Sequence, residues 1–328
     1  MNDKAEKHAA GKVYGFGTAT LDFRITTADF GEGYKEKLLA RKADIKGGGS
    51  VANALVQASR LGAKCAWLGK LGNDWIGRRI QRQLEDENID CANVIFDKNL
   101  CSPFNVAVYA GKALRRIGGF LIPNSLNELR SQEIKGFAEN IGEKDWVIVE
   151  LGEISLEQVL EFCTAVKGKN AKILLDVDLD PVRQCLGDEG CIEEIFALAD
   201  ILVPNYNSLK TMYPGYDIED LCEKLSGKYA VLTILTNGED GLYYAESGKS
   251  VAHMSAVKNT QIVDTVGAGD AFHGGLLYGL SRGIALEDAL QTAQKCASLN
   301  CSKFGAREGM PTLQELELNR IEQNIGGK

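Results

Sequence analysis

Short runs of apolar residues alternate along this chain with segments in which apolar residues recur every three or four positions. The first pattern is typical of buried strands, and the second of helices with one buried face. Val51, Leu55 and Ala58 share one such face, and Ser50 precedes them in a position suited to an N-cap. The pattern predicts strands at 13–17, 64–70, 145–151, 172–177, 201–203 and 230–235, and helices at 50–61, 74–85, 156–167, near 191–198, near 218–225, 267–281 and 285–303. Apolar strands that alternate with helices predict an α/β fold with a mostly parallel central sheet covered on both faces.

Two stretches depart from this alternation. Residues 23–46 alternate between polar and apolar without a convincing helix, and 104–109 with 113–121 predict a hairpin. We expect both inserts to lie at one end of the sheet and to form a small β-sheet lid. The predicted division is a core made of residues 12–22, 47–92 and 122–328, with lid inserts at 23–46 and 93–121.

Composition and charge narrow the class of protein. The 328 residues are 45% hydrophobic and 25% charged, which suits one large globular α/β domain with a small appendage. A formal net charge of −8 has the wrong sign for a surface that binds nucleic acid or anionic lipid. No apolar run approaches the roughly 18 to 20 residues of a membrane span, and the polar start at 1–12 does not resemble a secretion signal. We therefore expect a cytoplasmic protein without nucleic-acid or membrane partners.

The reactive side chains narrow the possible class of protein further. Nine cysteines occur singly, without a Cys-x-x-Cys pair, which predicts reduced and mostly buried thiols rather than a metal or disulfide framework. Only three histidines are present, which disfavours a hydrolase built on a Ser-His or Cys-His pair. Catalysis is expected to depend on carboxylates.

The most specific segment is Val-Asp-Thr-Val-Gly-Ala-Gly-Asp-Ala-Phe at 263–272, which follows a strand-like region at 255–263 and opens a predicted helix. Glycines at a helix start let successive backbone N–H groups converge on an anion, which the helix dipole also favours. Asp270 would lie beside that group, placed to accept a proton from a substrate hydroxyl. The alternative is that the small residues only pack the helix against the sheet and Asp270 caps it. Spacing alone leaves both open.

Two separated motifs together resemble the ribokinase-like (PfkB-type) carbohydrate and nucleoside kinases. The end motif matches at Asp264, Thr265, Gly267, Ala268, Gly269 and Asp270, and the front motif at Gly47, Gly48, Gly49, Asn53, the run 60–63, Gly69, Gly72, Asp74 and Gly77. Two motifs in the correct order over nearly the whole chain are far more specific than one glycine-rich loop. The resemblance implies a three-layer α/β/α fold with a small β-sheet lid, and transfer of a phosphoryl group from ATP.

The resemblance also implies a role for individual residues. Asp270 matches the catalytic base, and Gly267, Ala268 and Gly269 match the anion hole that stabilises the transferred phosphoryl group. The matched sugar contacts are Asp22, Gly48, Gly49 and Asn53. Without the resemblance, Asp22 is read as a turn carboxylate and Asn53 as a surface amide.

On the nucleotide side, the resemblance assigns Asn205, Thr236, Gly238 and Gly241, together with Gly267 and Gly269. Two positions depart from the family pattern. Ser208 stands where a glutamate supports magnesium, and Asp180 stands where some sugar-acid and fructose kinases have an arginine. Magnesium is still expected, because triphosphate chemistry needs its charge neutralised. A potassium ion near Asp264 and Gly305 is implied by the resemblance alone.

The remaining expectations concern the lid and the helix after the end motif. Arg115 and Arg116 lie where the family presents a basic residue to phosphates, and a solvated strand face is the alternative for one of them. His273 is expected to pack or to line the rim. Exposed strand edges on the lid allow pairing with a second subunit, as a homodimer.

These inferences favour an ATP-dependent kinase that phosphorylates a hydroxyl, primary by expectation, on a small sugar or sugar derivative. A nucleoside kinase on the same fold is the nearest alternative. An NAD-dependent oxidoreductase is disfavoured because the run 15–20 after the first strand lacks the third glycine of a dinucleotide-binding turn. A ligand-binding relative without activity stays open because of Ser208 and Asp180.

Overall fold

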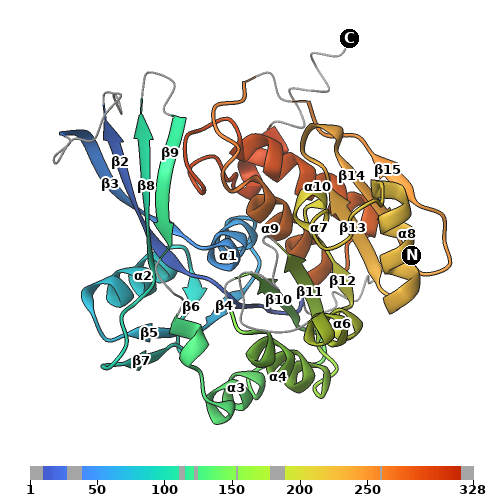
Figure 1. The fold of residues 1–328 in the computed structure, drawn as a ribbon, viewed down its shortest axis with the longest axis horizontal. Coiled ribbons are helices and arrows are strands. Elements are labelled where there is room, and N and C mark those ends of the chain that lie inside the picture. Colours follow the sequence, from blue (N-terminus) through green and yellow to red (C-terminus); the bar gives the residue numbers. More distant parts are fainter. Residues whose placement is uncertain are drawn as a thin grey trace, which may run out of the picture.

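A computed structural model describes residues 10–27, 39–110, 115–121, 125–152, 154–177, 189–258 and 261–318. Its centre is a nine-stranded sheet (Figure 1). Seven neighbouring strands are parallel, and the last two run antiparallel at one edge. In spatial order the strands are β15 (Ala252–Met254), β14 (Leu242–Ala245), β13 (Leu232–Thr236), β12 (Ile201–Leu202), β11 (Lys172–Val177), β10 (Trp146–Leu151), β1 (Val13–Phe16), β4 (Cys65–Leu68) and β6 (Ile89–Asp90).

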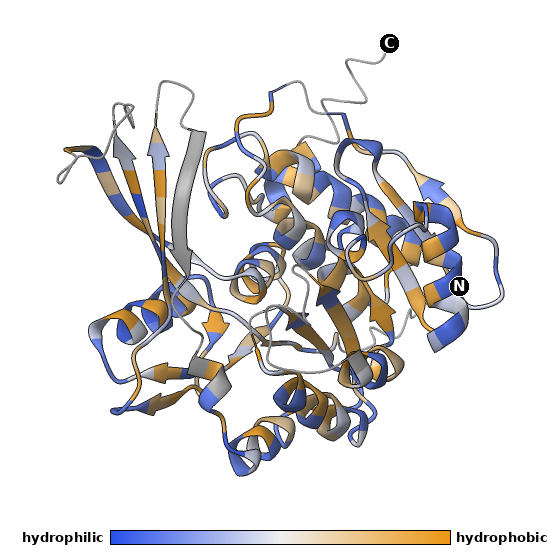
Figure 2. Ribbon diagram, in the orientation of Figure 1, coloured by the Kyte–Doolittle hydropathy of each residue, from blue (hydrophilic) through white to orange (hydrophobic). Residues whose placement is uncertain are grey.

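Helices cover both faces of this sheet because its strands are apolar on both sides. Alternate residues of β10 enter two separate clusters: Val147 and Val149 join one, and Ile148 joins the other. Figure 2 shows β10 and β11 as mostly hydrophobic between their covering helices. The first cluster is completed by α3 (Ser131–Ala138), α4 (Leu156–Lys167), α6 (Glu189–Leu198) and α8 (Ile218–Tyr229), and the second by α1 (Ser50–Arg60), α2 (Trp75–Asp86), α9 (Ala268–Ser281) and α10 (Leu286–Asn300). This is the predicted three-layer α/β/α arrangement.

A separate four-stranded sheet projects from one side of the layers (Figure 1). Its order is β3 (Ala40–Gly48), β2 (Thr20–Thr27), β8 (Phe104–Ala110) and β9 (Arg115–Leu121). β8 and β9 pair antiparallel, as the predicted hairpin requires, and β2 pairs parallel with β8. A further short pair joins β5 (Lys70–Gly72) to β7 (Ile95–Asp97). The chain thus contains the small sheet that the sequence predicts, while its division into core and lid segments stays a proposal.

Two local predictions are wrong. Ser50 is the first residue of α1 rather than its cap, because Gly49 occupies the cap position with φ 90°. The Ser50 hydroxyl instead donates a hydrogen bond to Glu150 Oε1, at 2.8 Å. The strand expected at 255–263 is also absent from the part of that stretch that is described, since β15 ends at Met254 and the chain continues without a ladder.

Candidate active site

The front and end motifs meet at a side-chain hydrogen bond. Asn53 in the first turn of α1 donates from Nδ2 to Asp270 Oδ2 in the first turn of α9, at 2.7 Å. Asn53 is only 4% exposed, so it is not the surface amide that would be expected without the family resemblance. The two helices pack against each other within one core cluster. The fold therefore joins residues 217 positions apart at one point.

The start of α9 presents backbone donors. Gly267 caps the helix with φ 77°, and a side chain there would overlap the Ala306 backbone. Ala268 N–H donates to Thr265 O at 3.2 Å, whereas the described residues supply no acceptor for the N–H groups of Gly267 and Gly269. Apart from its neighbours in the chain and the backbone of α9, no described heavy atom lies within 4 Å of the position that a Cβ on Gly269 would take. The positive end of a 14-residue helix thus faces open space beside Asp270.

Asp22 and the glycine turn, which we define as residues 47–49 where β3 ends and α1 begins, lie at the base of the small sheet. Asp22 is within β2, not in a turn, and its Oδ1 accepts hydrogen bonds from Asn105 Nδ2 at 2.9 Å and Thr20 Oγ1 at 3.1 Å. A side chain on Gly48 would overlap the Asp22 carboxylate, and one on Gly49 would overlap the backbone of residue 18. The lack of a side chain at these two glycines therefore leaves room for the Asp22 carboxylate and for the backbone of residue 18.

Sequence reasoning missed two charged residues of this region. Arg307, in the loop after α10, donates from Nε to Asn53 Oδ1 at 2.5 Å and from Nη2 to Gly48 O at 2.9 Å. Burial lowers the pKa of Arg307 to about 10, and the nearby carboxylates of Asp22, Glu87 and Asp270 act in the opposite direction. No periodic pattern marks a loop arginine, so the sequence carried no signal for it.

Glu150 is the second missed residue, and the sequence did mark it, because it is a charged residue near the end of an otherwise apolar strand. It is 3% exposed, and its Oε2 accepts from the Thr18 hydroxyl at 2.8 Å and the Thr18 N–H at 3.2 Å. With Ser50 on its other oxygen, Glu150 ties the end of β10 to the segment after β1 and to the start of α1. Buried carboxylates need such partners to remain stable.

The predicted nucleotide residues gather near the carboxyl ends of β12 and β13. Asn205 and Thr236 form a parallel bridge, and Asn205 caps the short helix α7 (Tyr206–Leu209) by accepting from Asn207 N–H at 2.8 Å. Gly238 and Gly241 have φ values of 56° and 93°, and a side chain on Gly241 would overlap Met254 O. Thr236 ends β13, Gly238 begins a short 3₁₀ turn, and Gly241 directly precedes β14. These residues therefore lie on separate elements from the Asn53–Asp270 contact.

Asp264 and Gly305 also come together. Asp264 accepts from Gly305 N–H at 3.0 Å and from Val266 N–H at 3.1 Å. Asn300, which is fully buried, donates to Val266 O at 3.0 Å, but its Oδ1 has no hydrogen-bond partner among the residues that the structure describes. An unpartnered buried acceptor close to a carboxylate-bearing loop suits a bound cation. In the described ranges, this region included, no group of three or more His, Cys, Asp or Glu residues is arranged to hold a metal.

Other predicted residues are placed only in part. Arg115 and Arg116 lie on β9, where their backbones pair with Ala110 and Tyr109; their side chains lie outside the described part. Asp180 also lies outside the described residues. His273 is 5% exposed and packs with Nε2 3.0 Å from Val203 O and Nδ1 3.5 Å from Asp176 Oδ2, which fits packing rather than the rim.

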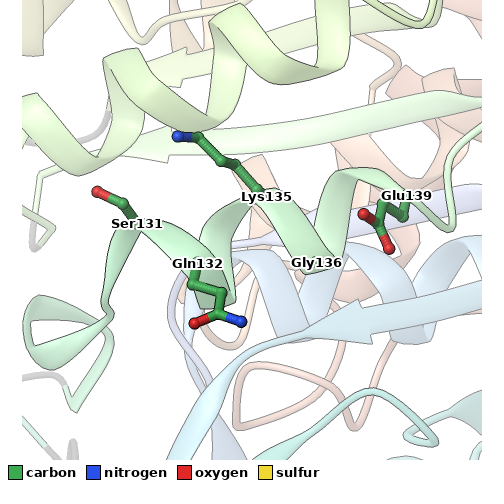
Figure 3. A pocket seen from close by; sticks show the side chains of 5 residues that line it. All are labelled: Ser131, Gln132, Lys135, Gly136 and Glu139. Carbon is green, nitrogen blue, oxygen red and sulfur yellow. The ribbon is translucent and has the colours of Figure 1, made fainter.

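A hollow elsewhere on the surface contains none of these residues. Figure 3 shows it along α3, lined by Ser131, Gln132, Lys135, Gly136 and Glu139. All five belong to one helix and the residue that ends it. In Figure 1, α3 lies far from the small sheet and from α9. The chemistry expected from the sequence is therefore not in this hollow.

A three-layer α/β fold with a small side sheet, and a carboxylate beside a glycine-rich helix start, define the class of a small-molecule kinase. The chain belongs to the pfkB family of carbohydrate kinases, whose family model matches residues 11–313. The family uses ATP, and this chain is accordingly a carbohydrate kinase. It is neither the NAD-dependent oxidoreductase nor the inactive ligand-binding relative considered from the sequence.

Known relatives span most of the chain. It is 27% identical over 281 residues to a ribokinase of Lactococcus lactis, covering 85% of this chain and 87% of the relative. It is 26% identical to a 5-dehydro-2-deoxygluconokinase of Bacillus licheniformis, covering 82% and 85%. The solved structure of Arabidopsis thaliana ribokinase complexed with ribose and ATP superposes with a TM-score of 0.80 at 22% identity, covering 94% of this chain and 98% of that one. This likeness confirms the fold. Within the described residues, no helix is long and apolar enough to cross a membrane.

Proposed function

We propose that this chain transfers the γ-phosphoryl group of ATP to a primary hydroxyl of a small sugar or sugar derivative, at the junction of α1 and α9. The observation that carries the proposal is the 2.7 Å hydrogen bond between Asn53 and Asp270. This hydrogen bond supports the proposal because one partner matches a sugar-binding residue and the other matches the base. The neighbouring Gly269 N–H has no acceptor among the described residues. The names of the relatives, a ribokinase and a 5-dehydro-2-deoxygluconokinase, support a sugar-like acceptor.

Each predicted residue has a part in this mechanism. Asp270 accepts the proton of the acceptor hydroxyl, whose oxygen then attacks the γ-phosphorus in line. The N–H groups of Gly267 and Gly269 stabilise the charge that develops on the phosphoryl oxygens, with Ala268 holding the turn between them. Asp22, Gly48, Gly49 and Asn53 bind the sugar hydroxyls. Asn205, Thr236, Gly238 and Gly241 hold the nucleotide, and we assign Arg115 and Arg116, which belong to β9, to its phosphates.

Two cations complete the proposal. Magnesium, when bound, would neutralise phosphate charge, and its ligands would be phosphate oxygens of ATP and water, which it prefers. Asp264, Gly305 and the unpartnered Oδ1 of Asn300 would hold a potassium ion behind the start of α9. Because Gly267 packs against Ala306, an ordered loop around Ala306 supports the start of α9, whose backbone N–H groups are the proposed donors.

The lid is proposed to pair with a second copy. Phe23 on β2, Phe104 on β8 and Trp75 on α2 form an aromatic group on the sheet face opposite Asp22. Trp75 is 60% exposed and Ile45, which pairs with Phe23, is 40% exposed. Exposed apolar side chains on one face of a projecting sheet favour contact with a matching surface. The predicted cytoplasmic location stays a prediction.

The test is a coupled assay of ADP release with magnesium and ATP across a panel of sugars, sugar acids and nucleosides. The wild-type chain is expected to release ADP with at least one sugar-like acceptor and little without one. The Asp270→Asn variant should lose about 10²- to 10⁴-fold in kcat while still binding ATP, because it lacks the base. Substantial turnover by Asp270→Asn, or activity with nucleosides alone, would contradict the proposal.

A further inference from the structure

Arg307 bridges the two halves of the proposed site although it belongs to neither motif. Its Nε donates to Asn53 Oδ1 on α1, and its Nη2 donates to Gly48 O at the end of β3. Asn53 in turn donates to Asp270 on α9. One guanidinium therefore touches the glycine turn directly and the proposed base through one intervening amide.

The chemistry of the three groups fixes the orientation of the Asn53 carboxamide. A carboxylate can only accept hydrogen bonds and a guanidinium can only donate them. The amide NH₂ must therefore face Asp270 and the amide oxygen must face Arg307, as observed. Without Arg307, the amide oxygen of Asn53 loses its hydrogen-bond donor, and the carboxamide is held less firmly with its NH₂ group towards Asp270.

The loop that carries Arg307 is anchored independently. Arg60 on α1 donates from Nη1 to Arg307 O at 2.6 Å and to Met310 O at 3.0 Å, and its guanidinium pairs with both oxygens of Glu87. Arg60 therefore fixes the backbone of the loop, whereas the Arg307 side chain reaches into the site. Among the described residues, no carboxylate oxygen lies within 4.0 Å of the Arg307 guanidinium, and its hydrogen-bond acceptors are the two oxygens named above.

We propose that Arg307 is a positioning residue of the phosphotransfer site, which holds Asp270 through the Asn53 carboxamide and holds the glycine turn through Gly48 O. The inference rests on the proposed function, because it assigns Asp270 as the base. It adds a residue that neither motif contains and gives the loop after α10 a part in the chemistry.

The experiment compares three variants with the wild-type enzyme, using the acceptor and MgATP of the panel assay. Arg307→Met removes both donors and keeps an apolar stem of similar length. Arg307→Gln retains a donor at the matching place, since Nε2 of glutamine and Nε of arginine are both bonded to Cδ. Arg60→Met is the matched control, because it removes the other side-chain anchor of the loop without touching Asn53 or Asp270. Thermal unfolding of each variant establishes that it is folded.

We expect Arg307→Met to lower kcat about 10- to 100-fold, the range expected when a buried acceptor loses its partner, with the KM for ATP unchanged. Arg307→Gln should recover at least about tenfold of that loss, and Arg60→Met should stay within about threefold of wild type. Crystals of Arg307→Met should show Asn53 Nδ2 no longer bonded to Asp270.

Three results would overturn the inference: a near-normal kcat in Arg307→Met, an equal loss in Arg60→Met, or a folded Arg307→Gln no better than Arg307→Met. If the wild-type chain phosphorylates nothing in the panel, the proposed function fails. The orientation of Asn53 in the Arg307→Met crystals then still decides whether Arg307 positions it.

Discussion

Two glycines in one turn give opposite predictions when each is changed to alanine. Gly267 has φ 77°, where an alanine costs about 1–2 kcal/mol, and its side chain would also overlap the Ala306 backbone. Gly269 lies within α9, and a Cβ added there would meet no described heavy atom within 4 Å outside its chain neighbours and the backbone of α9. The structure therefore predicts that the first substitution harms the fold and the second does not.

For Gly267→Ala, the backbone penalty and the overlap together lower the free energy of unfolding by about 2–4 kcal/mol. For Gly269→Ala, helix propensity favours alanine by up to about 1 kcal/mol, less in a first turn, so stability is unchanged or slightly higher. If the open space beside Gly269 receives the transferred phosphoryl group, however, a methyl group there displaces it. A displacement of about 1 Å costs about 10²-fold in rate.

The assay pairs urea unfolding with the kcat of ADP release for each variant. The account predicts a Gly269→Ala protein as stable as wild type with kcat reduced about 100-fold. A stable Gly269→Ala enzyme with normal kcat would refute the placement of the phosphoryl group. An equally stable Gly267→Ala variant would refute the structural argument for the turn.

Two further predictions concern acid stability and thiol reactivity. Burial alone would raise the pKa of Glu133, but hydrogen bonds from Arg130 and Lys70 lower this pKa from 4.5 to about 2. The ionised carboxylate therefore stabilises the fold above about pH 4.5, and this contribution is lost as the pH falls towards 2. Because Arg130 is 79% exposed, we expect Glu133 to contribute only about 1 kcal/mol to the free energy of unfolding. Between pH 5 and pH 3, the free energy of urea unfolding should fall less steeply for Glu133→Gln than for the wild type. Parallel curves for the two proteins would contradict this. Burial raises the pKa of Cys65, Cys91, Cys163, Cys222 and Cys296 to about 12, whereas Cys101 is exposed. Peptide mapping after brief alkylation should find Cys101 modified and these five protected, and rapid labelling of any of the five in the native protein would show the packing to be wrong.

The fold was predictable where periodicity is continuous and local. The helix at 156–167 and the strand at 172–177 have the predicted bounds, because buried strands and amphipathic helices leave direct patterns in the sequence. The strand predicted at 255–263 is wrong because the apolar residues of this segment are not buried in a sheet. Ile262 and Val263 are 64% and 59% exposed, and Val263 N–H donates to Cys301 O at 2.8 Å, a long-range contact with no local signature.

The candidate site was predictable only through its motifs. Gly267, Asp270 and Asn53 were named from the sequence, but spacing could not show that Asn53 and Asp270 share a hydrogen bond. Arg307 had no signal because its importance comes from where the loop after α10 folds back, not from its neighbours in the chain. Contacts between distant segments decide such roles, and a single sequence does not contain them.

The most direct test of the account is a crystal structure of the enzyme with ADP, a planar mimic of the transferred phosphoryl group, and the acceptor found in the panel. The account predicts that the mimic accepts hydrogen bonds from the N–H groups of Gly267 and Gly269. It also predicts the acceptor oxygen within about 3 Å of the Asp270 carboxylate. A mimic bound away from the start of α9, or an Asp270 carboxylate turned from the acceptor, would contradict the proposed site.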